Sequence, residues 1–395
     1  MKSNSRPKLP IPLPLLGSEG FAHFTVTQRL PALARQVIVD NNFSAQINGN
    51  LEKLASELTL GYLPPLVDDT GTDVGAWERY LAPYLGQRWV DVPWFLAETY
   101  FYRLLLEITN YFRPGEWQGV DPFEVQKRQG FYSSLDSVVA VCDRLNNELQ
   151  LPELLYFALW GNRVDLSLWS SQIDRSRFDI HSQLAHILVN DASKVAELLA
   201  ISNGRIDVVI DNAGFELFCD LCLVDFLLAS GVASLVNLHL KPHPTFVSDA
   251  TIKDLHETKS FLAAFHHPTV ASLGARLQEY IAHGHLAMKA DDFWTSPLAG
   301  WEMPDHLTRE LSSNLIIIKG DANYRRLLGD RHWDYTTNFA DIVCYLPSPM
   351  VALRTLKSEV VVGIQAEQIT ELKQTDPDWL INGQWGLIQS TDLGR

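Results

Sequence analysis

From about residue 205 onward, short apolar runs rich in β-branched residues alternate with stretches of helical periodicity. Each run is apolar at consecutive positions, which is typical of a parallel strand buried on both faces. The alternation predicts an α/β fold, a three-layer α/β/α unit around a mostly parallel sheet. The expected strands are Ile206–Ile210, Leu235–Leu240, Leu315–Ile318, Ile342–Leu346 and Val360–Ile364, and the expected helices are Phe215–Leu228, Thr251–Ala264, Ala322–Leu328 and Met350–Leu356.

The first part of the chain has a different pattern. Between about residues 21 and 155, apolar residues recur at intervals of three and four, as in Leu51–Leu58. This spacing is typical of amphipathic helices. We therefore predict an N-terminal helical bundle or cap domain over residues 1–160 and an α/β domain that binds metal and phosphate over residues 161–395.

Composition excludes several classes of protein. A chain of 395 residues that is 46% hydrophobic can bury a large core, which excludes wholesale disorder. Its formal net charge of −15 argues against sequence-independent nucleic-acid binding, which needs a basic face. No charge-free apolar stretch of about 18 residues and no signal-peptide pattern occurs, so we expect no membrane contact and a cytoplasmic location.

Polar residues follow directly at the ends of the predicted strands. The first strand runs into Asp211-Asn-Ala-Gly214, the second into a loop with Asp249, and the third into Lys319-Gly-Asp-Ala-Asn-Tyr-Arg325. In an open parallel sheet, ligands bind outside the carboxyl ends of the strands, so these residues are expected at one rim. One such segment alone is more often a turn with a helix cap, but their repetition at successive strands indicates a site.

The residue types at this rim predict phosphate chemistry with a divalent metal. Asp211, Asn212 and Asp249 offer hard oxygen ligands without thiol or imidazole, a set that suits Mg²⁺ or Mn²⁺. Cations of the kinds that bind phosphate are also present, namely Lys319, Arg325 and Lys357. Together they predict a metal-dependent phosphatase or phosphotransferase, in which the metal activates water and the cations stabilise developing charge.

Four segments together resemble the damage-control phosphatase family of metal-dependent enzymes. They are Ile210-Asp-Asn-Ala-Gly-Phe-Glu216, Phe246-Val-Ser-Asp249, Lys319-Gly-Asp-Ala-Asn-Tyr-Arg325 and Arg354-Thr-Leu-Lys357. The last is similar to the Arg-Thr-x-Lys element of subfamily III, which contains sugar-phosphate phosphatases and proteins called acidic-residue methyltransferases. The resemblance extends into the first half of the chain, where Arg29-Leu-Pro31 and Pro93-Trp94 with Glu98 also fit.

The resemblance implies roles for individual residues. Asp211, Asn212 and Asp249 would be the metal ligands and, with Asp321 as our candidate base or water-orienting group, the catalytic residues. The substrate-binding residues would be Glu216, Lys319, Gly320, Asp321, Ala322, Asn323, Tyr324, Arg325, Lys357 and Asn162. The implied substrates are small phosphorylated metabolites such as fructose 1-phosphate and fructose 6-phosphate. Mn²⁺ is the first choice of metal, with Co²⁺, Ni²⁺ and Mg²⁺ as alternatives.

Two other functions stay open at this point. An S-adenosylmethionine-dependent protein-glutamate O-methyltransferase is one, although no glycine-rich G-x-G turn follows the first strand. A non-enzymatic sensor of a phosphorylated metabolite is the other, although it would leave the oxygen ligands without a role. The pair Cys219 and Cys222 has the spacing of a metal or redox motif, but it lies in an apolar predicted helix, so we expect two buried small side chains.

Overall fold

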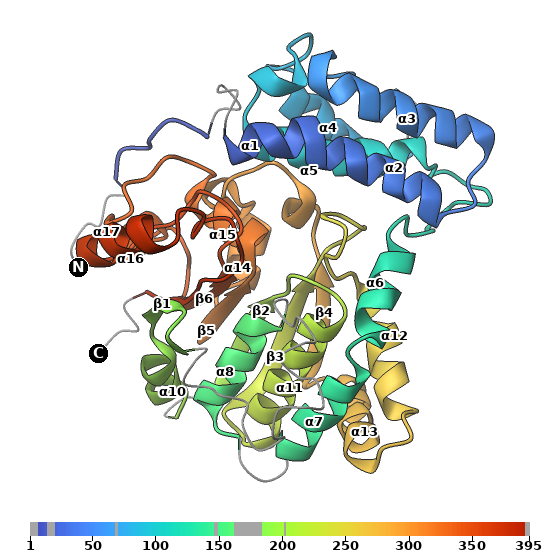
Figure 1. The fold of residues 1–395 in the computed structure, drawn as a ribbon. Helices are drawn as coiled ribbons and strands as arrows, with labels where there is room; N and C mark the ends of the chain where they lie inside the picture. The colour runs from blue at the N-terminus through green and yellow to red at the C-terminus, as the bar shows by residue number, and fades with distance from the viewer. Residues whose placement is uncertain are drawn as a thin grey trace.

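The computed structural model of this chain describes residues 7–13, 20–67, 70–145, 149–161, 184–200 and 203–391. The predicted fold class is confirmed, because helices cover both faces of a mostly parallel sheet (Figure 1). In spatial order the described strands are β1 (Ile187–Asn190), β7 (Gly386–Ser390), β6 (Met350–Thr355), β5 (Leu315–Lys319), β2 (Gly204–Val209), β3 (Ala233–Leu240) and β4 (Leu286–Ala290). Neighbouring strands are parallel except β6 and β7, which are antiparallel.

The helices form two groups. The first group gathers at one end of the sheet, and we call it the cap (Figure 1). The cap consists of α1 (Phe21–Phe24), a π-helical turn (Thr25–Arg29), α2 (Leu30–Asp40), α3 (Ala45–Leu60), α4 (Val74–Leu81) and α5 (Trp94–Ile108). The other α-helices that the structure describes are α6 (Glu124–Tyr132), α7 (Leu135–Leu145), α8 (Leu151–Trp160), α10 (Ala192–Ala200), α11 (Phe215–Ala229), α12 (Ile252–Ala263), α13 (Pro268–Ala282), α14 (Asp305–Glu310), α15 (Asp321–Leu328), α16 (Phe339–Ile342) and α17 (Ala366–Thr375).

The strand order changes direction next to β2, and this places the site. From β2 the chain proceeds to β3 and β4 on one side, whereas β5, β6 and β7 lie on the other side. A crevice forms at such a switch point, outside the carboxyl ends of the two central strands. Val209 of β2 pairs with Ile318 of β5. Two residues further along each strand, Asp211 and Gly320 therefore lie side by side at this crevice.

Side chains of the central strands alternate between two buried clusters. Leu315 and Ile317 of β5 belong to a cluster that also contains residues of α7, α8, α11, α12 and α13. Ile316 and Ile318 point to the opposite face and belong to a cluster that includes the cap. Successive residues of a strand face opposite sides, so the apolar run of β5 is what burial on both faces favours. Polar residues in β2 and β3 are buried only with partners, since Asn237 and His239 both hydrogen-bond to Asp207.

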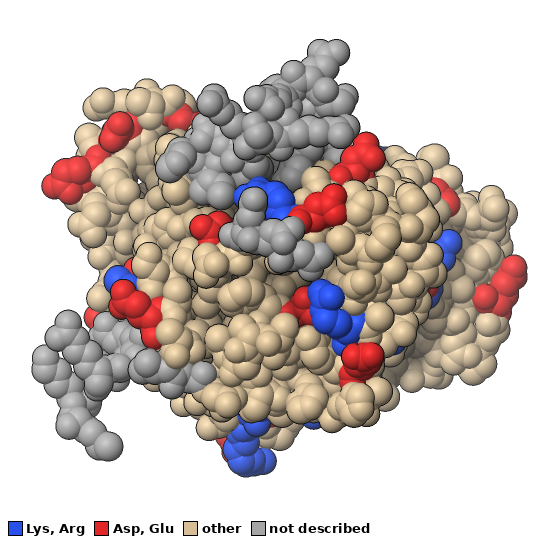
Figure 2. Space-filling model, turned by 90° about the horizontal axis from the view of Figure 1, so that it is seen from below, with Lys and Arg blue, Asp and Glu red and all other residues tan. Residues whose placement is uncertain are grey.

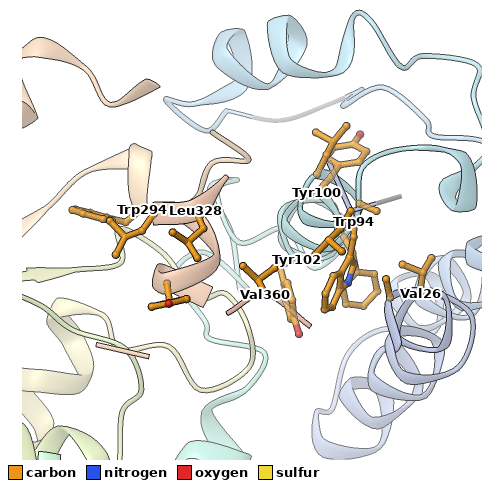
Figure 3. Close-up of a cluster of buried hydrophobic side chains, with 14 of the residues drawn as sticks. Val26, Trp94, Tyr100, Tyr102, Trp294, Leu328 and Val360 are labelled. Carbon is orange, nitrogen blue, oxygen red and sulfur yellow. The ribbon is translucent and has the colours of Figure 1, made fainter. Parts of the chain in front are cut away.

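The second of these clusters joins the cap to the α/β part of the chain. Figure 3 shows Val26 and Trp94 from the cap in the same buried cluster as Leu328 of α15 and Val360. The predicted helical character of the first half is confirmed. The division of the chain at residue 160 stays a prediction; α8, which precedes it, packs against the sheet with Leu154 and Leu155.

Three predicted elements are wrong. Met350–Leu356 was expected to be a helix but forms strand β6, because a short apolar run fits either element and its place between β5 and β7 decides. Val360–Ile364 was expected to be a strand but is irregular. Its buried carbonyls accept from side chains instead of from a neighbouring strand: the guanidinium of Arg354 donates to the Val360 carbonyl, and the side-chain amide of Gln389 donates to the Val362 carbonyl. Ile342–Leu346 was also expected to be a strand, but its first residue ends α16 and turns follow.

Strands β1, β4 and β7 were not predicted from the sequence. Both β1 and β4 are short edge strands with partly exposed side chains, and β4 is Leu-Ala-Met-Lys-Ala, a run without a β-branched residue. Propensity gives little signal for β4, which forms because β3 offers backbone partners, whereas β1, Ile-Leu-Val-Asn, is only four residues long.

Surface features are unexceptional on the face shown in Figure 2. Lys and Arg side chains there are scattered among Asp and Glu side chains rather than gathered in one field. Within the described parts of the chain, no helix combines the length and the apolar character needed to cross a membrane.

Candidate active site

The residues after β2 and the loop after β3 are held together by backbone hydrogen bonds. The Ala213 N–H donates to the Ser248 carbonyl over 2.7 Å, and the Ala250 N–H donates to the Asp211 carbonyl over 2.8 Å. This short antiparallel bridge pairs Asn212 with Asp249. The three predicted metal ligands are thus brought to one place, although they come from two segments of the chain.

The loop that carries Asp249 has a strained backbone. Phe246 and Val247 have φ angles of 46° and 68°, in the left-handed region. This region costs an L-residue roughly 1–2 kcal/mol and is rare for a β-branched side chain. The Phe246 ring packs against Tyr102 and Phe95 of α5, with centroids 5.1 and 6.3 Å apart. Packing against the cap therefore helps to hold the loop in the conformation that presents Asp249.

A cavity of about 140 Å³ opens at the switch point. Nine predicted site residues line it, namely Asp211, Asn212, Glu216, Asp249, Gly320, Asp321, Ala322, Arg325 and Lys357. Lys319, Asn323 and Tyr324 are buried below it and are not in its lining, so their contact with substrate stays a prediction. Asn162 lies outside the described residues.

Buried acidic side chains face one another in this cavity. The pKa of Asp211 is raised well above its usual value by burial and by the nearby charges of Asp249 and Glu216. Burial also raises the pKa of Asp249 to about 6, although Lys241 opposes the shift. Asn212 connects the group: its Nδ2 donates to Asp211 Oδ2 and to Glu216 Oε2, each over 2.8 Å. These carboxylates lack the positive charge that would let both aspartates ionise at low cost.

Lys319 is buried beneath the cavity and forms ion pairs with two acidic side chains. Its side chain is 1% exposed, and its Nζ lies 2.8 Å from Glu216 Oε1 and 2.9 Å from Asp220 Oδ1. Burial alone would lower the pKa of Lys319, but Asp220 and Glu216 outweigh it and hold the pKa above its usual value. Lys319 is therefore paired with Glu216 and Asp220, and its charge is not free for a ligand.

Asn323 and Tyr324 are also structural in this arrangement. Asn323 Oδ1 accepts a hydrogen bond from Lys241 over 3.0 Å, and its Nδ2 donates to the Lys319 carbonyl over 2.9 Å. The Tyr324 ring stacks on Phe339 and its hydroxyl donates to Gln389 over 2.9 Å. Both side chains support the loop and helix that begin at Gly320.

Asp321 and Lys357 form the other side of the cavity. Asp321 Oδ1 accepts from Arg354 Nε over 2.8 Å, from the Lys357 N–H over 3.1 Å and from Ser358 Oγ over 3.0 Å. Burial would raise the pKa of Asp321, but Arg354, Arg325 and the Lys357 N–H hold it below its usual value. The Arg-Thr-x-Lys element thus positions Asp321 through Arg354 and contributes Lys357 to the cavity.

Sequence reasoning missed half of the cavity lining. The additional residues are Phe21, Arg29, Trp94, Glu98, Leu159, Phe246, Ser248, Leu353 and Thr355. Several stand in the segments that resemble the family, but no periodicity indicates that the cap covers the strand ends. Cys219 and Cys222 are fully buried in α11, as expected. The described residues contain no group of three or more His, Cys, Asp or Glu arranged to hold a metal; the candidate set is two carboxylates and one amide.

Comparison with known proteins decides the family. Residues 25–372 match the damage-control phosphatase ARMT1-like domain. The chain belongs to the damage-control phosphatase ARMT1-like family. It is 32% identical to damage-control phosphatase ARMT1 of Danio rerio, over 95% of each chain, and 32% identical to that of Homo sapiens, over 96% of this chain and 98% of the human one.

A solved structure agrees with this assignment at the level of the fold. A DUF89 family protein of Pyrococcus horikoshii matches with a TM-score of 0.50 and 14% identity, over 93% of this chain and 98% of that chain. The prediction of a hydrolase of the phosphatase class is confirmed by membership of the damage-control phosphatase family. That family acts on damaged or small metabolites and is generally metal-dependent.

The buried acids predict how stability depends on pH without metal. Asp249 and Asp220, with pKa values raised by burial to about 6 and about 7, hold a proton in the folded state at pH values where the unfolded chain has lost it. The folded state is therefore favoured at low pH, and this contribution is lost as the pH rises from about 4 to about 7. We expect the melting temperature of EDTA-treated protein to fall between about pH 5 and pH 7.5.

Added Mn²⁺ is the control for this pH scan. A bound cation favours the ionised carboxylates, so the stabilisation by Mn²⁺ is expected to grow over the same pH range. A metal-free melting temperature that rises between these two pH values would contradict the burial of Asp249 and Asp220 without sufficient counter-charge.

Proposed function

We propose that this phosphatase hydrolyses the phosphomonoester bond of small sugar phosphates, such as fructose 1-phosphate or fructose 6-phosphate, with a divalent cation bound by Asp211, Asn212 and Asp249. The observation that carries the proposal is the meeting, in one crevice at the sheet's switch point, of buried acidic oxygens without sufficient counter-charge and of cationic side chains suited to phosphate. A cytoplasmic location stays a prediction from the sequence.

The residues present fit a hard divalent cation. Asp249 Oδ2 is buried and accepts no hydrogen bond from the described residues; Lys241 Nζ lies 3.3 Å away. The Asn212 Oδ1 accepts from Ser248 Oγ over 2.6 Å, and an amide oxygen has a second lone pair to offer. An all-oxygen set of this kind favours Mn²⁺ or Mg²⁺, and Mn²⁺ is our first choice. When bound, such a cation would polarise a phosphoryl oxygen and lower the pKa of a bound water.

The chain's own groups would bind and orient the reactants. Lys357 supplies a positive charge for the phosphate from the loop after β6. Asp321 is the water-orienting group that we propose: its Oδ1 is occupied, whereas its Oδ2 accepts no hydrogen bond within the described chain. Because the low pKa of Asp321 makes it a weak base, orientation of the water suits it better than removal of its proton.

The size of the cavity favours a small substrate. Pockets for drug-sized ligands have volumes of roughly 300–1,000 Å³, and this cavity of about 140 Å³ is smaller. The apolar side chains Phe21, Trp94 and Phe246 lie in the same lining and would exclude bulk water from the bound phosphate.

Phosphate release from a panel of sugar phosphates tests the proposal. The protein is assayed after treatment with EDTA and again with added Mn²⁺, Co²⁺, Ni²⁺ or Mg²⁺. We expect EDTA to stop release and Mn²⁺ to restore it, with fructose 1-phosphate or fructose 6-phosphate among the best substrates. Release that is unaffected by EDTA would contradict the metal site.

A calorimetric titration with S-adenosylmethionine distinguishes the phosphatase from the alternative function, a protein-glutamate O-methyltransferase. The turn after β2 contains one glycine, Gly214, and so lacks the glycine-rich fingerprint that binds such nucleotide cofactors. We therefore expect no tight binding. Silence of the phosphatase panel together with binding of S-adenosylmethionine would replace the phosphatase proposal by methyl transfer.

A further inference from the structure

We propose that Arg29, on the π-helical turn of the cap, binds the substrate phosphate and completes the phosphate subsite from the side of the cap. The inference deepens the proposed phosphatase function and rests on it. All the phosphate ligands that were predicted from the sequence and that the structure describes lie in the α/β part of the chain. Arg29 would add a ligand from the cap.

The cations that line the cavity differ in whether an acidic partner already pairs with them. Arg29, Arg325 and Lys357 all line it. Arg325 is already neutralised, since its Nε lies 2.8 Å from Asp330 Oδ1 and its Nη1 lies 2.6 Å from Glu98 Oε2. Its guanidinium also stacks over the Trp94 ring, 3.6 Å from the centroid. Arg325 therefore braces the cavity wall and has little charge left for a ligand.

Arg29 and Lys357 differ from Arg325 in this respect. Within the parts of the chain that the structure describes, neither side chain forms an ion pair or a hydrogen bond. A phosphate is an anion, and the cavity also contains the acidic residues Asp211, Asp249 and Glu216, so cations with unpaired charge in the same lining favour its binding. Arg29 has the further property of a forked guanidinium, which can donate two hydrogen bonds to one phosphate.

The local backbone places Arg29 at the cavity. Thr25–Arg29 forms a π-helical turn between α1 and α2. A π-helical turn contains an extra residue, which rotates Arg29 by roughly 100° relative to an uninterrupted α-helix. Val26 and Leu30 on either side are buried in the cap. The turn thus keeps its apolar neighbours in the core while Arg29, which is exposed, lies at the cavity.

Binding of inorganic phosphate to the Mn²⁺-loaded protein tests the proposal directly. Calorimetry would compare the wild type with R29Q, R29K and R35Q. Arg35 is the matched control, an arginine of the neighbouring helix α2 that pairs with Glu52 at the surface and lies outside the cavity lining. We expect R29Q to weaken phosphate binding at least tenfold, R29K to weaken it less because a point charge replaces the fork, and R35Q to bind within about twofold of wild type.

Steady-state kinetics give the second readout. The KM for the best sugar phosphate should rise in R29Q by about the factor by which phosphate affinity falls. Phosphate affinity in R29Q equal to that of R35Q would overturn the proposal, and so would a raised KM with unchanged phosphate affinity, since Arg29 would then contact the sugar. If the wild type releases no phosphate with any metal, the proposed function fails, while the phosphate titration still decides the role of Arg29.

Discussion

Replacing Asp249 by alanine is expected to abolish metal binding and phosphate release together. The variant removes one of two carboxylates in the proposed metal site, and the oxygen set would then offer a cation only Asp211 and Asn212. Loss of metal-assisted charge stabilisation of several kcal/mol corresponds to a fall in turnover of about 10³-fold or more. Mn²⁺ titration by calorimetry and the phosphate-release assay measure the two effects.

Two further variants make this result interpretable. Asp249→Ala also leaves Lys241 buried without its acidic partner, which destabilises the fold. Asp249→Asn keeps the shape and a hydrogen-bonding oxygen beside Lys241, so loss of activity in a folded Asp249→Asn protein separates chemistry from folding. Asp305→Ala, at an exposed aspartate in the first turn of α14, should retain activity. Full metal-dependent turnover by Asp249→Ala would overturn the assignment of the metal site.

Substitution of Gly320 by alanine is expected to disrupt both stability and the site. Gly320 has φ of 85°, and a Cβ there would overlap the carboxyl group of Asp211, which follows the adjacent strand β2. The backbone conformation costs roughly 1–2 kcal/mol and the overlap roughly 1–3 kcal/mol more, so the free energy of unfolding should fall by about 2–5 kcal/mol. Relief of the overlap must move Asp211, so Mn²⁺ affinity should fall as well.

Gly231 supplies the matched control for this substitution. Its φ of 74° is similar, but a Cβ would meet no other atom. Gly231→Ala should therefore show the backbone cost alone, with Mn²⁺ affinity unchanged. Urea unfolding of both variants measures the difference. Equal losses of stability in the two variants, with equal Mn²⁺ affinity, would show that Asp211 does not lie against Gly320.

The fold class could be predicted because strands that are buried on both faces appear in the sequence as short apolar runs. Strands such as β5, whose residues Leu315–Ile318 are covered on both faces, are apolar at successive positions, and the polar turn after each of them is equally visible. The strand order is not visible, because the same alternation fits several arrangements. The irregular segment Val360–Ile364 could not be told from a strand by its sequence. It is apolar like a strand, but the side chains of Arg354 and Gln389, which lie outside it, donate to its buried carbonyls.

The candidate site was predictable only on the sheet side. Asp211, Asn212 and Asp249 follow strands, so the rule for open parallel sheets places them at one rim. Residues such as Arg29 and Trp94 come from the cap, and their presence in the lining depends on how two distant segments dock. Lys319 was predicted to bind phosphate because it is a cation at a strand end. In the structure it is paired with the buried carboxylates of Glu216 and Asp220 instead.

Helix α5 restricts how this enzyme can be re-engineered. Through Glu98 it holds Arg325 of α15, and through Phe95 and Tyr102 it holds the strained loop that presents Asp249. A chimera that received its cap from a relative would therefore inherit a new support for two loops of the α/β part. Exchange of caps, as a route to new substrates, will preserve metal binding only if the incoming helix carries an acid for Arg325 and aromatic rings for Phe246.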